Sequence, residues 1–387
     1  MKKRVLLITS MPYFQWRGSP IRIRFDLQAL AESGYEVDLI TLPIGEDLLV
    51  EGTTIHRVGN PLGITSISIG PSLTKLFFDV LLLWRALSFS AKNKVDVVHG
   101  FEETGAVAWL VGRIRGARVV FEKHSDPGSY KQNLLKNLVL WAYKQVETFT
   151  IRHADAVIGT GEALCEQARE VAPGKPVHHI FDIPSSLTEP DQDRADLLAQ
   201  TYRKHPDEVL ALYVGSFASY QGIDLMFDSM PYVLKKHPQV RFLIVGGSPE
   251  EIAGRTDWLT RHGIAGQVSF LGKLPPDELP HTLAAADILL SPRQHGVNTP
   301  LKLLDYLKAA RPIVATDTPA NRRILDDSFA MLVEGTAPAF AAGINTLVGE
   351  EDLRLRFGVT GRELIDTRYN FEEFKRRLAA CYAEVLS

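Results

Sequence analysis

Cysteine is almost missing from this chain, since Cys165 and Cys381 are the only two in 387 residues. So few thiols cannot build a disulfide framework, which excludes the small disulfide-stabilised secreted classes and favours a reducing compartment. Charge of one sign is not in excess either, because 43 Lys and Arg residues balance 46 Asp and Glu residues. We therefore expect a cytoplasmic protein that has no nucleic-acid partner.

A long hydrophobic run is absent too. The most apolar stretch, residues 73–89, carries Lys75, Asp79 and Arg85, and it is too short and too charged to span a bilayer. We expect a buried helix there. The alternative is a surface helix in a membrane interface, which would give peripheral contact with the inner face of the cytoplasmic membrane. Its anchors would be Phe77, Phe78 and Trp84, with basic residues nearby at Lys92, Lys94, Arg113, Arg115 and Arg118.

Several catalytic and cofactor motifs are missing as well. Without G-x-G-x-x-G, nothing indicates a nicotinamide or flavin cofactor. Without G-x-S-x-G, hydrolysis by a Ser-His-Asp triad has no support. His and Cys spacings fit no zinc site, and no D-x-D follows an apolar strand, so we expect no metal.

What the chain does contain is a regular alternation of apolar strands with helices, which is typical of parallel sheets covered on both faces. At 387 residues we expect two α/β domains, each with a doubly wound sheet. The polar segment 186–206 separates residues 1–185 from residues 207–368, and a helix follows at 369–387. Strands are predicted at 4–10, 35–43, 53–59, 95–100, 117–124 and 155–160, and then at 209–216, 240–247, 267–272, 287–292, 312–316 and 330–334. Ligands of such folds bind at the carboxyl ends of the strands, in a cleft between the domains.

The stretch 299–317, TPLKLLDYLKAARPIVATD, is the most informative. Thr299 and Pro300 read as the N-cap and first residue of a helix. Lys302, Asp305 and Tyr306 then fall on one side of that helix. Unpaired N–H groups and a lysine suit an anion, and a carboxylate one turn later suits a hydroxylated ring. An ordinary amphipathic helix is the alternative.

Other candidates stand at predicted strand ends. His124 and His99 each end a strand, where a histidine can contact a sugar hydroxyl or move a proton, or can make a structural hydrogen bond. Gly18 precedes Ser19-Pro20, a second predicted helix start, and leaves room for a ligand or simply forms a turn. A further group of small or neutral residues follows two predicted strands: Gly215, Ser216, Gln221 and Gly246. Phosphate binding and ordinary turn formation account for these residues equally well.

Taken together, these blocks resemble the retaining glycosyltransferases of family 4, also called group 1, which have the GT-B fold of two Rossmann-like domains. The resemblance covers nearly the whole chain. It rests on LLDYLKAARPIVATDTPANRRIL at 303–325, RVLLITS…RGSP at 4–20, VVFEKHSD at 119–126 and YVGSFASYQGIDLMFDSM at 213–230.

The resemblance implies an enzyme that needs no cofactor or metal and moves a sugar from a nucleotide-diphosphate sugar to a glycan or lipid-linked acceptor. The first domain would bind the acceptor, the second would bind the donor, and the last helix would cross back to the first domain. Asp305 would hold the donor ribose, His124 the donor sugar, and Gly18 would leave space between donor and acceptor. Diphosphate contacts would come from Ser216, Gln221, Asn298, Thr299, Pro300, Leu301 and Lys302.

The chain departs from the family pattern at the diphosphate. Ser216 and Gln221 stand where relatives commonly carry Arg and Lys, and Val297 and Asp305 replace two glutamates. Lys302, together with Arg293 or Lys273, would supply the positive charge that these positions lack at the diphosphate. The alternatives are a non-catalytic sugar- or nucleotide-binding relative that has lost phosphate ligands, and a sugar-nucleotide epimerase of the same fold.

Overall fold

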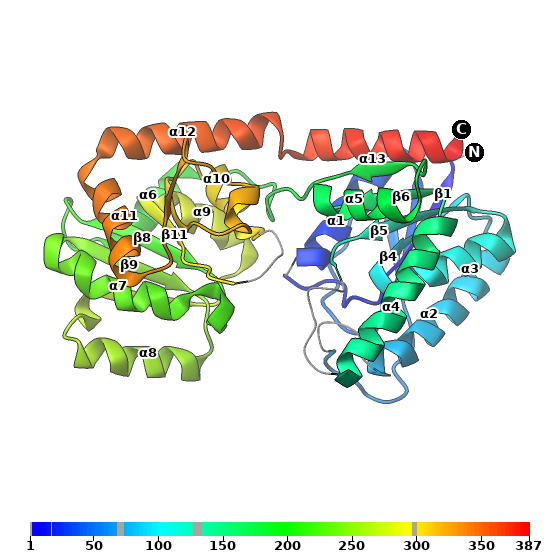
Figure 1. The fold of residues 1–387 in the computed structure, drawn as a ribbon, viewed down its shortest axis with the longest axis horizontal. Helices are drawn as coiled ribbons and strands as arrows, with labels where there is room; N and C mark the ends of the chain where they lie inside the picture. The colour runs from blue at the N-terminus through cyan, green and yellow to red at the C-terminus, as the bar shows by residue number, and fades with distance from the viewer. Residues whose placement is uncertain (1, 17, 68–72, 127–133, 296–299) are drawn as a thin grey trace. The chain divides into compact units, whose positions relative to one another are not determined.

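The computed structural model describes residues 2–16, 18–67, 73–126, 134–295 and 300–387, without the side chains of 73 and 134–139. The chain divides into two compact units. Unit 1 comprises Met1–Asp182 and Phe371–Ser387, and unit 2 comprises Ile183–Asn370. Figure 1 shows that each unit is a sheet with helices packed against it.

Unit 1 is built on a seven-stranded sheet in which every pairing is parallel. Six of its strands were predicted, whereas the seventh has only three half-buried residues and therefore lacks an apolar run. The strand order is β3-β2-β1-β4-β5-β6-β7. The strands are β1 (Arg4–Ile8), β2 (Glu36–Thr41), β3 (Thr53–Arg57), β4 (Val97–Phe101), β5 (Arg118–Lys123), β6 (Ala156–Gly159) and β7 (Val177–His179).

The helices of unit 1 form two groups. Helices α2 (Leu73–Lys92), α3 (Gly105–Arg115), α4 (Leu134–His153) and α5 (Glu162–Val171) contact one another in succession. Helix α1 (Gly18–Glu32) packs against α13 (Phe371–Leu386), so the end of the chain is part of the first unit. Helix α1 begins at Gly18 and not after an N-cap at Ser19, because Gly18 already has helical geometry.

Helix α2, the apolar stretch of the sequence, is buried along one face only. Phe78, Leu82 and Ala86 are fully buried in the core of unit 1. The opposite face exposes Leu76, Val80 and Trp84, at 61%, 62% and 69%. The prediction that Phe78 is a membrane anchor is therefore wrong, whereas Trp84, another predicted anchor, is exposed. No helix in the described part of the chain is long and apolar enough to cross a membrane.

Unit 2 contains a six-stranded parallel sheet, and all six strands were predicted. The order β10-β9-β8-β11-β12-β13 makes it doubly wound, since the chain reverses its direction across the sheet between β8 and β11. Ligands of such sheets bind at the carboxyl ends of the strands beside this point. The strands are β8 (Val209–Val214), β9 (Val240–Val245), β10 (Val268–Gly272), β11 (Ile288–Ser291), β12 (Ile313–Thr316) and β13 (Ala330–Val333).

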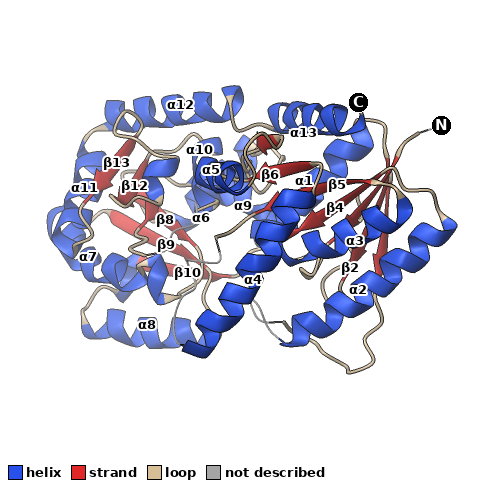
Figure 2. Ribbon diagram, turned by 45° about the vertical axis from the view of Figure 1, so that its right-hand side comes forward, coloured by secondary structure: helices blue, strands red, loops and turns tan. Residues whose placement is uncertain are grey.

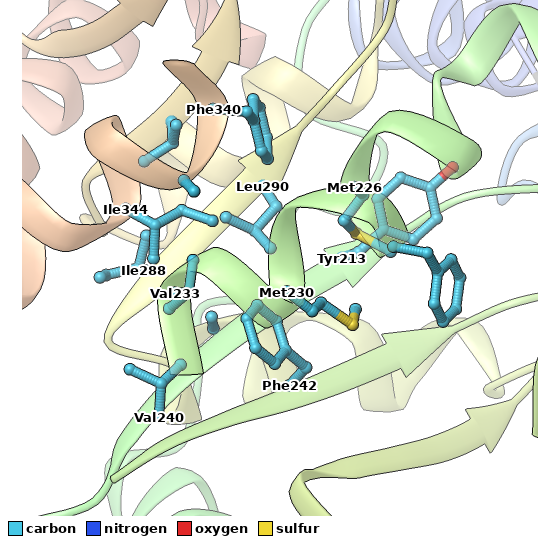
Figure 3. Close-up of a cluster of buried hydrophobic side chains, with 14 of the residues drawn as sticks. Tyr213, Met226, Met230, Val233, Val240, Phe242, Ile288, Leu290, Phe340 and Ile344 are labelled. Carbon is cyan, nitrogen blue, oxygen red and sulfur yellow. The ribbon is translucent and has the colours of Figure 1, made fainter. Parts of the chain in front are cut away.

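Helices cover this sheet on both faces (Figure 2). In the hydrophobic core on one face of the sheet, Met226 and Met230 of one helix pack with Phe242 and Leu290 of two strands, as Figure 3 shows. The helices are α6 (Gln192–Tyr202), α7 (Ile223–Lys236), α8 (Pro249–Arg261), α9 (Leu279–Ala285), α10 (Lys302–Lys308), α11 (Ala337–Gly349) and α12 (Glu351–Thr367). Helices α5, α8 and α9 were not among the predicted elements. Helix α8 buries only Leu259 fully, although the capping box of Ser248 and Glu251 marks its start.

Candidate functional site

Three loops meet at the carboxyl edge of the unit 2 sheet, beside the β8–β11 reversal. They approach so closely that only glycine fits at two of the contacts. A Cβ on Gly246 would lie 2.0 Å from the carbonyl oxygen of Gly215, and one on Gly222 would lie 1.8 Å from that of Pro292. Both glycines also have positive φ, +114° and +72°, which other residues adopt only with strain. The loops after β8, β9 and β11 therefore form one compact edge.

Lys302, the first residue of α10, directs its ammonium group to this edge. Its Nζ lies 4.5 Å from the centre of the Tyr213 ring and 3.4 Å from the Gln221 Oε1 atom. Burial, together with repulsion from Arg293, lowers the pKa of Lys302 to about 7. An anion bound at this lysine would reverse both effects, because a negative charge stabilises the ammonium form.

Arg293, which follows β11, is the second cation of the edge. Only 8% of its surface is exposed, and its guanidinium stacks over the ring of Tyr220 at 5.6 Å. Its Nε donates a hydrogen bond to the carbonyl oxygen of His295. Among the residues that the structure describes, no carboxylate forms an ion pair with Arg293 or Lys302. A buried arginine and a half-buried lysine that repel each other and have no carboxylate counter-ion among the described residues are suited to binding an anion.

The start of α10 differs from the prediction. The helix runs from Lys302 to Lys308, and its N-cap residue is Leu301, so Pro300 is not its first residue. Pro300 is buried and Leu301 is half-buried. The predicted cap Thr299 and the neighbouring Asn298 lie outside the described residues, as do Gly296 and Val297. At seven residues the helix is short, so an anion would be held by Lys302 and Arg293 and not by a helix terminus.

Asp305 and Tyr306 make structural contacts within unit 2. The Oδ1 atom of Asp305 accepts hydrogen bonds from the backbone N–H of Ser185 at 2.6 Å and from its hydroxyl at 3.0 Å. Burial raises the pKa of Asp305 to about 6. Tyr306 is fully buried; its hydroxyl accepts from the N–H of Val214 and donates to the carbonyl of Leu290. Of the three residues predicted to share one side of the helix, Tyr306 therefore faces the sheet and is not exposed to a ligand.

The remaining predicted donor residues divide into those at this edge and one that is remote from it. Ser216 is exposed just beyond Gly215, and its carbonyl accepts a hydrogen bond from the Tyr213 hydroxyl. Gln221 reaches Lys302, as described above. Lys273 follows β10, at the margin of the sheet two strands from β8, and is exposed.

In unit 1, His124 follows β5 and contacts a buried ion pair. Its Nε2 atom lies 2.6 Å from Oε1 of Glu122, which is fully buried. The same oxygen accepts a hydrogen bond of 2.5 Å from Nε of Arg22, on α1. Arg22 also contacts Asp182 at 3.2 Å. The structure thus gives His124 a carboxylate partner, whose charge is balanced by an arginine.

His99 differs from its predicted role. It is fully buried, stacks on Phe101 with a ring separation of 4.5 Å, and lies 2.9 Å from the hydroxyl of Tyr382. It therefore offers no exposed atom to a ligand. Gly18 is the half-buried first residue of α1.

Two further residues of unit 1, Glu102 and Tyr143, are linked to His124 by hydrogen bonds and were not predicted as site residues. Glu102, directly after β4, has a positive φ of 50° and accepts a hydrogen bond from the backbone N–H of His124 at 2.7 Å. Tyr143 donates to the other oxygen of Glu102 at 3.1 Å. Burial raises the pKa of Glu102. The only sequence signal was position, because Glu102 follows an apolar strand that was already predicted.

Comparison with known families agrees with this architecture. The family description "Glycosyl transferase 4-like domain" matches residues 18–180, and "Glycosyl transferases group 1" matches residues 208–350. Together they account for more than three quarters of the chain. The chain belongs to the group 1 glycosyltransferases. The resemblance inferred from the sequence blocks is thereby confirmed.

Among curated group 1 glycosyltransferases, this chain is similar to the phosphatidyl-myo-inositol mannosyltransferase of Mycobacterium leprae, at 26% identity over 168 residues. That match spans 43% of this chain and 43% of the mannosyltransferase, so less than half the relative's length is covered.

Solved structures show the same fold. Sucrose-phosphate synthase from Thermosynechococcus elongatus superposes with a TM-score of 0.78 at 20% identity, over 99% of both chains. HepE of Anabaena, in complex with UDP, superposes with a TM-score of 0.76 at 14% identity, over 99% of this chain and 100% of that chain. At these identities the likeness concerns the fold alone, and the predicted GT-B fold is confirmed.

Proposed function

We propose that this protein is a retaining, metal-independent glycosyltransferase that moves a sugar from a nucleotide-diphosphate sugar to a glycan or lipid-linked acceptor, in cell-surface polysaccharide synthesis. The observation that carries the proposal is the pair of neighbouring cations at the carboxyl edge of the unit 2 sheet, the half-buried Lys302 and the buried Arg293. The UDP complex of HepE, a protein of the same fold, supports a nucleotide as the ligand.

In the proposed reaction the bond between the anomeric carbon of the sugar and the diphosphate oxygen breaks, and both bonding electrons leave with the nucleoside diphosphate. The acceptor hydroxyl oxygen forms the new bond on the same face of that carbon, and its proton passes to the departing diphosphate. Lys302 and Arg293 stabilise the charge that develops on the leaving group. This role compensates for the neutral side chains of Ser216 and Gln221.

The other predicted residues keep, in the proposal, the roles that the family resemblance implies for them. Asp305 holds the ribose through its Oδ2 atom, since Oδ1 is engaged by Ser185. His124 accepts a hydrogen bond from a hydroxyl of the donor sugar. Unit 1 binds the acceptor, and Gly18 leaves space at the transfer point. Asn298 and Thr299 remain predicted diphosphate ligands, as in the sequence analysis.

The first test is binding. UDP, GDP and ADP are screened by thermal shift, because a ligand that binds the native state raises the melting temperature by mass action. Lys302→Ala should abolish the shift, whereas Lys236→Ala, which removes an exposed lysine of α7, should leave it unchanged. Equal shifts in both variants would exclude Lys302 from the diphosphate site.

The second test is turnover, measured as donor hydrolysis and as transfer to glycan and lipid-linked acceptors, with and without EDTA. Activity that survives EDTA supports metal independence, and unchanged activity in both His124→Ala and Lys302→Ala would exclude the proposed site. Nucleotide binding without turnover across the panels would favour the rival function, a non-catalytic binding subunit.

We further propose that unit 1 contacts a membrane surface through α2. Leu76, Val80 and Trp84 recur at helical spacing along its exposed face, which is where an interfacial helix carries its apolar anchors. Exposed basic residues follow at Lys92, Lys94, Arg113 and Arg115. Flotation with anionic liposomes at low salt tests this. Trp84→Ser should reduce binding and Leu355→Ser, an exposed leucine of α12, should not.

A further inference from the structure

His124 belongs to a chain of four polar groups that extends into the interior of unit 1. Glu122 and His124 are two residues apart along an extended segment, so their side chains fall on the same side of the sheet. This places the Nε2 atom of His124 2.6 Å from Oε1 of Glu122. The carboxylate therefore contacts the histidine directly.

Glu122 is held as an anion. Burial by itself would raise its pKa, but the charge of Arg22 and hydrogen bonds from His124 and His99 keep the pKa of Glu122 well below its usual value. Arg22 is only 3% exposed, and its guanidinium stacks over the ring of Phe374 at 5.0 Å. Both partners are thus fixed by packing as well as by charge.

The second oxygen of Glu122 leads to the end of the chain. Its Oε2 atom lies 3.4 Å from Nε2 of His99. The Nδ1 atom of His99 lies 2.9 Å from the hydroxyl of Tyr382, a fully buried residue of α13. When Tyr382 donates to Nδ1, neutral His99 carries its proton on Nε2, facing Glu122. The order of contacts is Tyr382, His99, Glu122, His124.

We propose that Glu122 is a positioning residue that fixes the ring of His124 with its Nε2–H donated to the carboxylate, and that His99 and Tyr382 hold Glu122 in the orientation this requires. With Nε2 committed, the ring offers Nδ1 as a hydrogen-bond acceptor, and within the described residues Nδ1 has no protein partner. His124 is then set to receive a hydroxyl group of the donor and not an anionic oxygen. The part of this inference that concerns catalysis rests on the proposed function.

The direct test is nuclear magnetic resonance of the histidine ring N–H groups in the full-length protein. A ring N–H that donates to a buried carboxylate exchanges slowly with water and gives a visible signal. We expect such a signal from His124, identified by its loss in His124→Gln. The signal should vanish in the double variant Arg22→Met with Glu122→Met, which removes both charges and so avoids leaving one unpaired in the core. A signal that persists in that variant would overturn the proposal.

Tyr382→Phe keeps the test decisive if the double variant does not fold, because it removes a single hydroxyl. We expect faster exchange of the His124 ring proton and a several-fold lower kcat, with unchanged UDP affinity, because the proposed nucleotide site lies in unit 2. Tyr35→Phe is the matched control, since the ring of Tyr35 packs 5.5 Å from that of Tyr382. Identical exchange rates in the two variants would refute the chain of contacts.

The two proposals fail in different ways. A protein without turnover but with the protected His124 signal would contradict the glycosyltransferase assignment and support the positioning of His124. Normal turnover with no effect of Tyr382→Phe on kcat or exchange would support the enzyme and contradict the positioning. A purely structural role of Tyr382 would lower the melting temperature and leave both kcat and the exchange rate at their wild-type values.

Discussion

At the scale of single residues, the feature with the clearest chemical consequence is the low pKa of Lys302. Burial and the charge of Arg293 lower it to about 7, so the unliganded protein holds a largely neutral lysine above that pH. A bound diphosphate favours the charged form. Binding and protonation of Lys302 are therefore linked in the proposed donor site.

We predict that UDP binding takes up about one proton at pH 8, and that affinity falls by up to about tenfold per pH unit above 7. The sign follows because the bound state retains the proton to higher pH than the free state. Calorimetry in buffers of different ionisation enthalpy measures the uptake. In Lys302→Arg the side chain stays charged at this pH. The only proton uptake left on binding should therefore be that of the nucleotide itself. Equal uptake in wild type and variant would contradict the prediction.

Asp26 is a second residue whose environment sets its charge. It is fully buried beside Arg22, and burial followed by the charge of Glu122 raises its pKa well above the usual value. The native state thus binds this proton more tightly than the unfolded chain. Stability is therefore lost as pH rises above about 4, the value for an unfolded aspartate.

We predict that Asp26→Asn, which keeps the shape and removes the titration, stabilises the protein at pH 7 relative to wild type. The difference should grow as pH rises from 4 and should disappear at lower pH, where wild-type Asp26 is protonated in both states. Urea midpoints measured across this range test the prediction. Asp228→Asn, on the exposed face of α7, should show no such trend.

At the scale of elements, α10 is attached to the sheet by one hydroxyl. Tyr306 accepts from the N–H of Val214 at 2.9 Å and donates to the carbonyl of Leu290 at 3.3 Å, which joins α10 to β8 and β11. This bridge stands where the sheet reverses direction. It therefore helps to fix Lys302, four residues earlier on the same helix, at the candidate site.

We predict that Tyr306→Phe lowers the free energy of unfolding of unit 2 by about 1–3 kcal/mol, because a buried N–H loses its acceptor. Denaturant unfolding measures the change. Tyr232→Phe, whose residue is 53% exposed on α7, is the control and should have no effect. UDP affinity should also fall in Tyr306→Phe, through displacement of Lys302. A variant as stable as wild type would show that the hydroxyl does not support α10.

At the scale of the whole molecule, the last helix belongs to the first unit. Helix α13 packs against α1 and buries Phe374, Leu378 and Tyr382. Residues 371–387 therefore complete a core whose other members lie before residue 183. Unit 1 cannot be made from the first half of the sequence alone without exposing this surface.

We predict that Leu378→Ala destabilises unit 1 by about 2–5 kcal/mol, as expected for a buried leucine, and leaves unit 2 unchanged. Hydrogen exchange followed by mass spectrometry distinguishes the units, because only peptides from 1–182 and 371–387 should lose protection. Leu355→Ala, at a leucine 61% exposed on α12, should alter neither. Loss of protection confined to unit 2 would contradict the division of the chain.

The sequence by itself determined the fold class and most of the strands. Apolar runs separated by helices mark a parallel sheet because buried strands need continuous hydrophobic residues. Twelve of the thirteen strands in the described part of the chain were predicted, although one of them, β3, is not a continuous apolar run. Strand β7 and helix α8 escaped because they bury little and so leave a weak pattern. Lys302 could be singled out because a local motif marks a helix start beside it, and His124 because it stands at the end of a predicted strand.

Only the tertiary structure decided what these residues contact. His124 is linked through Glu122 to residues 22, 99 and 382, which lie far away in the sequence, and folding brings the cations of Arg293 and Lys302 close enough to repel each other. No local pattern encodes the contacts of Glu122 with Arg22 and His99, because they depend on which elements meet at one edge of the sheet. The pKa of Lys302, the buried state of His99 and the structural bonds of Asp305 and Tyr306 follow from burial and neighbouring charge, which exist only once the chain has folded.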